Sequence, residues 1–118
     1  MIRTKFSDGI AVLVGCLMLT GTILLYSTWS EAQAGMTILQ QGIAFKPGSA
    51  KVKVGGQVTF RNEDPFGHNV YSPSQGGIFD IGLQAPDSET AVTFKETGTY
   101  IIQCRIHPKM RATVTVSP

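Results

Sequence analysis

Cysteine is scarce in this sequence, and its scarcity limits how the chain can be stabilised. The 118 residues include two cysteines, Cys16 within an apolar run near the N-terminus and Cys104 close to the C-terminus. Residues 35–118 contain only the second of these, so that part of the chain cannot form an internal disulfide. A domain of this size has a marginal core. A bound metal held partly by Cys104 would stabilise the fold in place of a disulfide and would also occupy the lone thiol.

Helical periodicity and basic runs are also missing. No stretch of residues 35–118 repeats its apolar side chains at the spacing of an amphipathic helix. The chain carries 10 Lys and Arg against 8 Asp and Glu, a net charge of +2, without a basic cluster or an array of aromatic side chains for stacking on bases. We therefore expect no nucleic-acid partner.

Residues 1–34 have the layout of an export signal. Two basic residues precede an apolar run over 10–26, and Ala32-Gln33-Ala34 puts small residues where signal peptidase requires them. We expect cleavage after Ala34, which leaves one exported domain over residues 35–118. Two alternatives stay open. The apolar run is at the short edge of a membrane span and could be an uncleaved anchor, or Cys16 could belong to a lipoprotein signal.

From residue 35 onward, apolar and polar residues alternate between Gly and Pro breaks, a pattern typical of half-buried strands. We expect short strands over residues 36–41, 43–45, 51–54, 57–62, 68–72, 90–94, 99–104 and 112–116. The stretch 73–86 is predicted to be irregular, with one short strand around 78–80. Seven to eight short strands at this spacing predict an all-β fold, a Greek-key β-sandwich or small barrel.

Residues that bind soft metals gather near the C-terminus. Cys104, His107 and Met110 form a Cys-x2-His-x2-Met loop, and the one other histidine is His68. A compact loop at a strand end can direct three side chains to one point, with His68 arriving from a neighbouring strand. Two imidazoles, a thiolate and a thioether are the ligands of a trigonal copper site with a weak axial sulfur. Sulfur suits Cu(I) and imidazole suits both oxidation states, so such an ion could cycle between Cu(I) and Cu(II).

Zinc and nucleophilic catalysis are the rival interpretations. A structural zinc site needs four strong nitrogen or sulfur ligands, and this chain offers three besides a thioether. Cys104 and His107 could in principle form a nucleophilic pair, but their spacing around a tight loop is poor geometry, and no motif supplies an orienting group or an oxyanion hole. Each residue has an ordinary structural explanation alone. Together they favour copper.

These residues resemble the cupredoxins, the blue-copper family, and within it the plastocyanin/amicyanin group. The resemblance covers about residues 51–116. Four segments carry it: Val58-Thr-Phe-Arg-Asn62-Glu, His68-Asn69-Val70, Glu96-Thr-Gly-Thr-Tyr100 and Cys104-x-x-His107-Pro-x-Met110-Arg. The Cys-x2-His-x2-Met spacing is similar to that of amicyanin in particular.

The resemblance implies a role for each matching residue. The implied copper ligands are two imidazoles, one thiolate and one long axial thioether: His68, His107, Cys104 and Met110. Asn69 would tie the two ligand loops together and help shield the Cys104 sulfur. Pro108 would stiffen the loop, and His107 would lie near the surface inside an apolar patch through which electrons pass.

Two positions depart from the amicyanin pattern. Gly67 stands where a proline is common, and Lys109 stands where amicyanin has an aromatic side chain. Lys109 together with Arg105 and Arg111 predicts a cationic rim around His107. We therefore expect redox partners with an acidic docking face, because charge complementarity chiefly raises the encounter rate. A merely solvated rim is the alternative.

The sequence thus predicts a monomeric type 1 copper protein that carries single electrons in the periplasm or an equivalent exported space. Its partners would be larger redox proteins, a donor dehydrogenase and an oxidase or cytochrome acceptor. We do not expect an enzyme, because all four candidate copper positions are filled and none is open to a substrate. The alternative is a copper-delivery or storage protein without fast electron transfer, tethered to the membrane if residues 10–26 are retained.

Overall fold

A computed structural model describes residues 35–74 and 79–118. The expected signal segment and Ile78 lie outside these residues. The described residues form nine strands and no helix, so none of them belongs to a helix that could cross a membrane.

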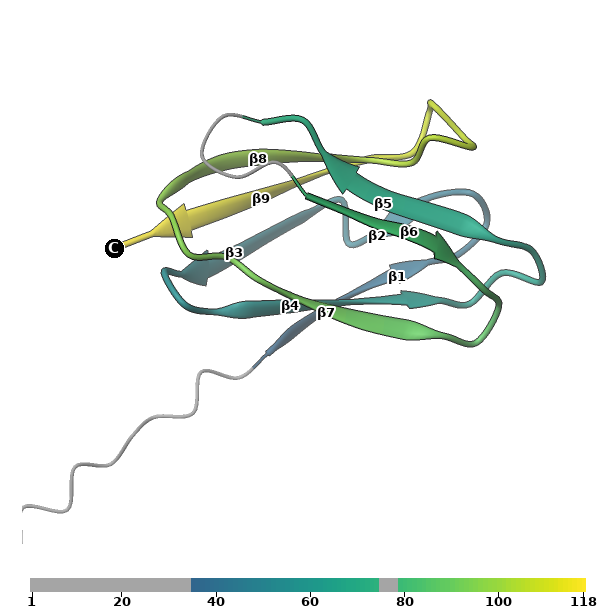
Figure 1. The fold of residues 1–118 in the computed structure, drawn as a ribbon, viewed down its shortest axis with the longest axis horizontal. Coiled ribbons are helices and arrows are strands. Elements are labelled where there is room, and N and C mark those ends of the chain that lie inside the picture. Colours follow the sequence, from purple (N-terminus) through teal and green to yellow (C-terminus); the bar gives the residue numbers. More distant parts are fainter. Residues whose placement is uncertain (1–34, 75–78) are drawn as a thin grey trace, which may run out of the picture. The chain divides into compact units, whose positions relative to one another are not determined.

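The strands form two sheets that face each other (Figure 1). The first sheet has the order β2-β1-β4-β7, with bounds Phe45–Lys46, Met36–Gln40, Gln57–Asn62 and Glu89–Thr93. The second has the order β3-β9-β8-β5-β6, with bounds Ser49–Lys53, Arg111–Ser117, Gly98–Gln103, His68–Ser72 and Phe79–Gln84. The predicted all-β Greek-key sandwich is confirmed. Nine strands form where seven to eight were expected, and the short strand expected around 78–80 is longer, because β6 continues to Gln84 within a stretch expected to be largely irregular.

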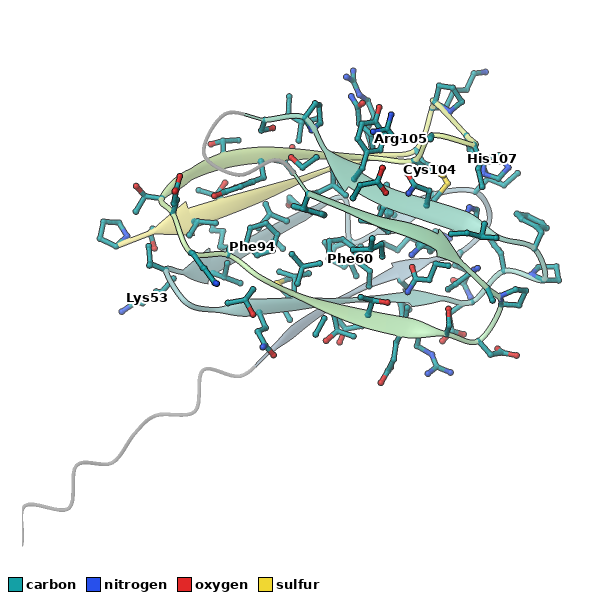
Figure 2. The ribbon with its side chains drawn as sticks, viewed as in Figure 1. Lys53, Phe60, Phe94, Cys104, Arg105 and His107 are labelled. Carbon is teal, nitrogen blue, oxygen red and sulfur yellow. The ribbon has the colours of Figure 1, made fainter. Side chains whose placement is uncertain are left out.

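One core lies between the sheets and is built from alternating positions of both. Val58 and Phe60 of β4 and Ile102 of β8 are fully buried, as period-two patterning requires. Figure 2 shows Phe60 and Phe94 between the two layers. In the sequence, Val52 and Val54 alternate with Lys51 and Lys53, which predicts that the two valines share a buried face; this prediction is wrong at Val54. Val54 is 43% exposed because β3 ends one residue earlier and the chain turns there.

A buried polar contact joins the sheets near the end where His68 begins β5. The Gln84 side chain on β6 donates to the backbone carbonyl of Phe60 on β4 at 2.6 Å and accepts a hydrogen bond from the Gln40 amide on β1. Asn62, at the end of β4, donates to the backbone carbonyls of Phe66 at 2.8 Å and of Gln84 at 3.0 Å. These bonds satisfy backbone groups that the core would otherwise leave unpaired.

Replacing the buried Gln84 with leucine should therefore lower the free energy of unfolding, although leucine is the more apolar side chain. Gln84→Leu leaves the Phe60 carbonyl and the Gln40 amide without their partner inside the core, which should cost about 2 kcal/mol or more. The same substitution at the exposed Gln57 should change stability by less than about 0.5 kcal/mol. Urea unfolding of both variants measures the difference, and equal midpoint shifts would contradict the bridging role.

Candidate metal centre

The strand ends that carry the predicted site meet at one end of the second sheet. β5 begins at His68, and β8 ends at Gln103, directly before Cys104. Antiparallel pairing of Tyr71 with Gln103 brings these two ends together. The chain then turns back into β9 through a tight loop, which the Met110 N–H closes by donating to the His107 carbonyl at 2.9 Å.

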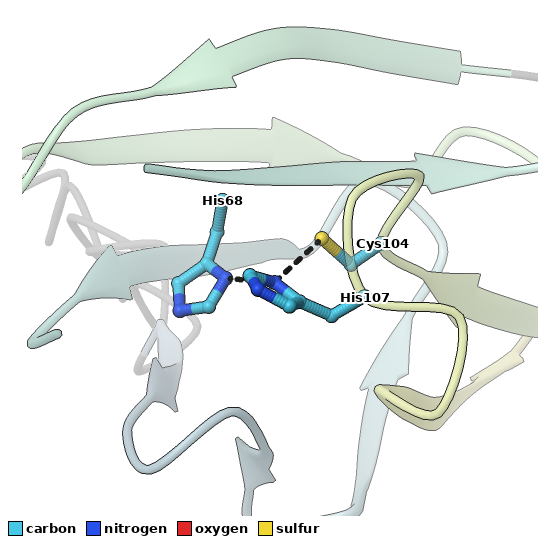
Figure 3. Close-up of side chains that lie close together, drawn as sticks. All are labelled: His68, Cys104 and His107. Carbon is cyan, nitrogen blue, oxygen red and sulfur yellow. Dashed lines mark hydrogen bonds between the residues drawn. The ribbon is translucent and has the colours of Figure 1, made fainter. Parts of the chain in front are cut away.

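The donor atoms of His68, Cys104 and His107 face one another (Figure 3). The two Nδ1 atoms are 3.1 Å apart, the His107 Nδ1 lies 3.9 Å from the Cys104 Sγ, and all three donors lie within 4.8 Å of one another. Imidazole and thiolate ligands about 2.0–2.3 Å from a shared metal are themselves separated by roughly 3–4 Å. The three residues therefore fit one metal ion. Met110, the fourth predicted residue, ends the same loop with its side chain buried.

Asn69 links the two segments that carry these donors. Its backbone N–H donates to the Cys104 Sγ at 3.3 Å, and its side-chain oxygen accepts from the Arg105 N–H at 3.2 Å. Its side-chain amide donates to Asp80 at 2.7 Å and to the Gly82 carbonyl at 3.0 Å. The expectation that Asn69 ties the loops together is confirmed.

The three donor residues differ in exposure. His68 and Cys104 are 0% and 1% exposed, whereas His107 is only partly buried. The Phe66 ring packs on both imidazoles, with centroids 5.3 Å from His68 and 5.8 Å from His107. A shallow hollow beside His107 is lined by Ile43, Ile106, Pro108 and Lys109. We call the exposed side chains of Ile43, Phe66, Ile106 and Pro108 the apolar rim. The expectation that His107 reaches the surface within apolar residues is confirmed.

Gly67, the residue that departs from the amicyanin pattern, allows a close approach. A Cβ atom at this position would lie 2.8 Å from the Leu83 Cδ1. A larger residue therefore requires the Leu83 side chain, itself 74% exposed, to move aside.

Arg105 does not contribute a free charge to the expected cationic rim. Its guanidinium lies 2.8 Å from the Asp80 carboxylate and 4.0 Å from the centre of the Tyr71 ring. The hydrogen bond from Arg105, joined by those from the Gly82 N–H and the Asn69 amide, lowers the pKa of Asp80 to about 2. Lys109, in contrast, lines the hollow beside His107.

Sequence reasoning did not identify Asp64, which contacts His68 directly. One oxygen of this buried carboxylate lies 2.7 Å from the His68 Nε2. Burial alone would raise the pKa of Asp64, but hydrogen bonds from the Ile43 N–H, from His68 and from the Gly42 N–H outweigh it and hold the pKa below its ordinary value. The only sequence feature that connects Asp64 with His68 is their spacing of four residues. Such a spacing brings two side chains together on a helix, but no helix is predicted here, so it does not indicate a contact.

An all-β sandwich that gathers two imidazoles and a buried cysteine sulfur at one end has the architecture of a cupredoxin. The chain belongs to the plastocyanin/azurin family of copper-binding proteins, since the model of this family matches residues 32–117. The cofactor of this family is a type 1 copper ion, and His68, Cys104 and His107 can form its site.

Two relatives illustrate the similarity. The amicyanin of Paracoccus denitrificans is 38% identical over 69 residues, which cover 55% of this chain and 52% of the amicyanin. The chain thus spans about half the length of that relative. A chloroplastic plastocyanin of Physcomitrium patens is 30% identical over an alignment that covers 99% of this chain and 77% of the relative. Amicyanins and plastocyanins are electron carriers.

Solved structures agree on the fold. A mutant of amicyanin in its Cu(I) form superposes with a TM-score of 0.66 at 26% identity, over 73% of this chain and 85% of that one. A copper-containing nitrite reductase from Thermus scotoductus gives a TM-score of 0.67 at 27% identity, over 71% of this chain. That match covers only 22% of the reductase, so the similarity is to one part of the enzyme and not to the whole of it.

The pair of Asp80 with Arg105 should make stability depend on pH in a defined window. The pKa of Asp80 falls from 3.8 to about 2 on folding, so its contribution is complete above about pH 4 and is lost as the pH falls through 2. The difference in thermal midpoint between the wild type and Asp80→Asn should therefore be constant above pH 4 and shrink toward pH 2. Glu96→Gln, an exposed turn substitution, is the control. A difference that persists unchanged at pH 2 would show that charge is not its cause.

Proposed function

We propose that this protein is a type 1 copper protein that carries single electrons between larger redox proteins. His68 and His107 would hold the metal through Nδ1, Cys104 through its sulfur and Met110 through its thioether, and together they would supply the soft and borderline donors that copper takes. The observation that carries the proposal is the convergence of three donor atoms within 4.8 Å in a family that binds copper. Copper in such a ligand set supplies a reversible one-electron couple.

The surroundings of the site favour fast transfer because they keep the donors in place. The Cys104 sulfur accepts from the Asn69 N–H, and the Met110 N–H closes the loop that bears His107. Donors fixed by the protein move little between oxidation states, so little reorganisation is needed when an electron arrives or leaves. His107, partly exposed within the apolar rim, is the route for electrons between the site and a docked partner.

A carrier also fits the burial of the donors better than a delivery or storage protein does. A delivery protein must expose its ligands to a receiving protein, but His68 and Cys104 are 0% and 1% exposed. A catalytic copper needs an open coordination position, whereas Met110 and the three clustered donors account for all four positions. We therefore propose a carrier without enzymatic activity, acting as a monomer.

We propose that the carrier is exported. Residues 1–34 act as a signal peptide cleaved after Ala34, and residues 35–118 form the periplasmic protein; retention of 10–26 as an anchor would give a membrane-tethered carrier instead. The family match, which begins at residue 32, supports a boundary at this place. The N-terminal residue of the protein recovered from expressing cells, read by mass spectrometry, distinguishes the two forms.

The copper assignment predicts a colour. Cu(II) added to residues 35–118 should give an intense blue or green band from thiolate-to-copper charge transfer. Cys104→Ser should lose this band, because the thiolate is its source. Met36→Leu should retain it, because Met36 begins β1 in the first sheet, whereas the three donors lie on or directly after strands of the second sheet. A colourless wild-type complex would overturn the assignment. A blue complex without reversible voltammetry would favour storage over transfer.

The cationic side chain beside His107 predicts salt-dependent electron transfer with an acidic or anionic partner. The test is the rate at which hexacyanoferrate(III), an anionic oxidant, oxidises the reduced protein, measured at increasing ionic strength. Lys109→Gln should slow the reaction a few-fold at low salt and flatten its salt dependence, because steering by charge is screened beyond a Debye length. Lys53→Gln, which removes a charge at the end of the β-sandwich opposite His107 (Figure 2), should change little. A wild-type rate that does not fall with added salt would remove the idea of an acidic docking face.

A further inference from the structure

Asp64 lies in a cradle of hydrogen-bond donors. One carboxylate oxygen accepts from the Gly42 N–H at 2.7 Å, and the other accepts from the Ile43 N–H at 3.0 Å and lies 2.7 Å from the His68 Nε2. The side chain is 8% exposed. Asn62 fixes its backbone by accepting from the Asp64 N–H at 2.9 Å. A buried carboxylate in this setting is held rigidly and is directed at the imidazole.

The backbone that forms the cradle is unusual. Gly42 and Ile43 are consecutive residues with φ of +63° and +57°. Glycine adopts this left-handed region freely, but a β-branched residue rarely does. Consecutive N–H groups in such a turn create a concave site for an anion. Here the anion is the Asp64 carboxylate, so the unfavourable conformation of Ile43 has an identifiable function.

The hydrogen bond from His68 to Asp64 determines which imidazole nitrogen faces the donor cluster. Both Asp64 oxygens already accept from backbone N–H groups, so the carboxylate is the acceptor toward His68 as well, and the imidazole proton lies on Nε2. The Nδ1 atom then presents a lone pair on the side where it lies 3.1 Å from the Nδ1 of His107. Carboxylates that accept from the distal nitrogen of a ligating histidine fix its tautomer and ring orientation and increase its basicity.

We propose that Asp64 is a positioning residue that fixes His68 for copper and lowers the reduction potential, and that the left-handed turn at Gly42–Ile43 serves to hold its carboxylate. This inference rests on the proposed copper site. A negative charge in contact with a ligand favours Cu(II) over Cu(I), because the more highly charged ion gains more from it.

Asp64→Asn tests the proposal, because it keeps the size of the side chain and removes its charge. Loss of such a partner typically weakens metal binding about 10- to 100-fold. We expect Cu(II) affinity to fall more than Cu(I) affinity. A tenfold greater loss for Cu(II) corresponds to a rise in potential of about 59 mV in this one-electron couple. Glu63→Gln is the matched control, because it removes the same charge from the adjacent exposed residue and should leave the potential nearly unchanged.

A second measurement needs neither copper nor a variant. In the metal-free wild type, ¹⁵N NMR should show His68 protonated at Nε2, with a proton protected from exchange. The Nδ1–H tautomer would overturn the positioning role even if the protein turns blue with Cu(II). A blue wild type with equal potentials in Asp64→Asn and Glu63→Gln would reduce Asp64 to a fold-stabilising residue. A colourless wild type with the Nε2–H tautomer would instead overturn the proposed copper function and leave the orientation of His68 standing.

Discussion

The hydrogen bond from the Asn69 N–H to the Cys104 sulfur is the contact on which the organisation of the site depends. It joins the start of β5, which carries His68, to the end of β8, where the loop that bears His107 begins. Because Asn69 also accepts from the Arg105 N–H and donates to Asp80, a single residue fixes the starting points of both donor-bearing segments. The donors can therefore converge without a disulfide and without a helix in the described part of the chain.

Around this contact the interior changes from apolar to polar in a way that suits the site. The middle of the sandwich is filled by side chains such as Phe60 and Phe94. Toward the site the buried residues become polar, with Gln84 bridging the sheets and Asn62 and Asp64 ordering the segment before His68. Apolar packing supplies stability but little direction, whereas hydrogen bonds fix orientation. Metal ligands that must keep their positions while the charge of the metal changes therefore need hydrogen bonds around them.

The sequence predicts most of what depends on residue type and spacing. Alternation around Val58 and Phe60 identifies β4 with its correct bounds, and the Cys-x2-His-x2-Met loop with His68 identifies residues of which three prove to be clustered. It does not predict features that depend on contacts between distant segments. Asp64 and Ile43 are 21 residues apart, and their hydrogen bond exists only after β1 and β4 have paired. The pairing of Arg105 with Asp80 depends on distant segments in the same way, so the sequence counts the Arg105 charge toward the rim although Asp80 balances it.

The loop between β1 and β2 connects the buried and exposed sides of the site. The backbone N–H of Ile43 holds Asp64, and through it His68, while its side chain is 46% exposed and lines the hollow beside His107. In the proposed carrier, a partner docked on the apolar rim would therefore touch a residue whose backbone supports the more deeply buried imidazole. The same partner would reach His107 through the loop that carries this histidine. Ile43 and residues 106–109, far apart in the sequence, line one hollow, so the proposed docking surface borders both histidine-bearing parts of the site.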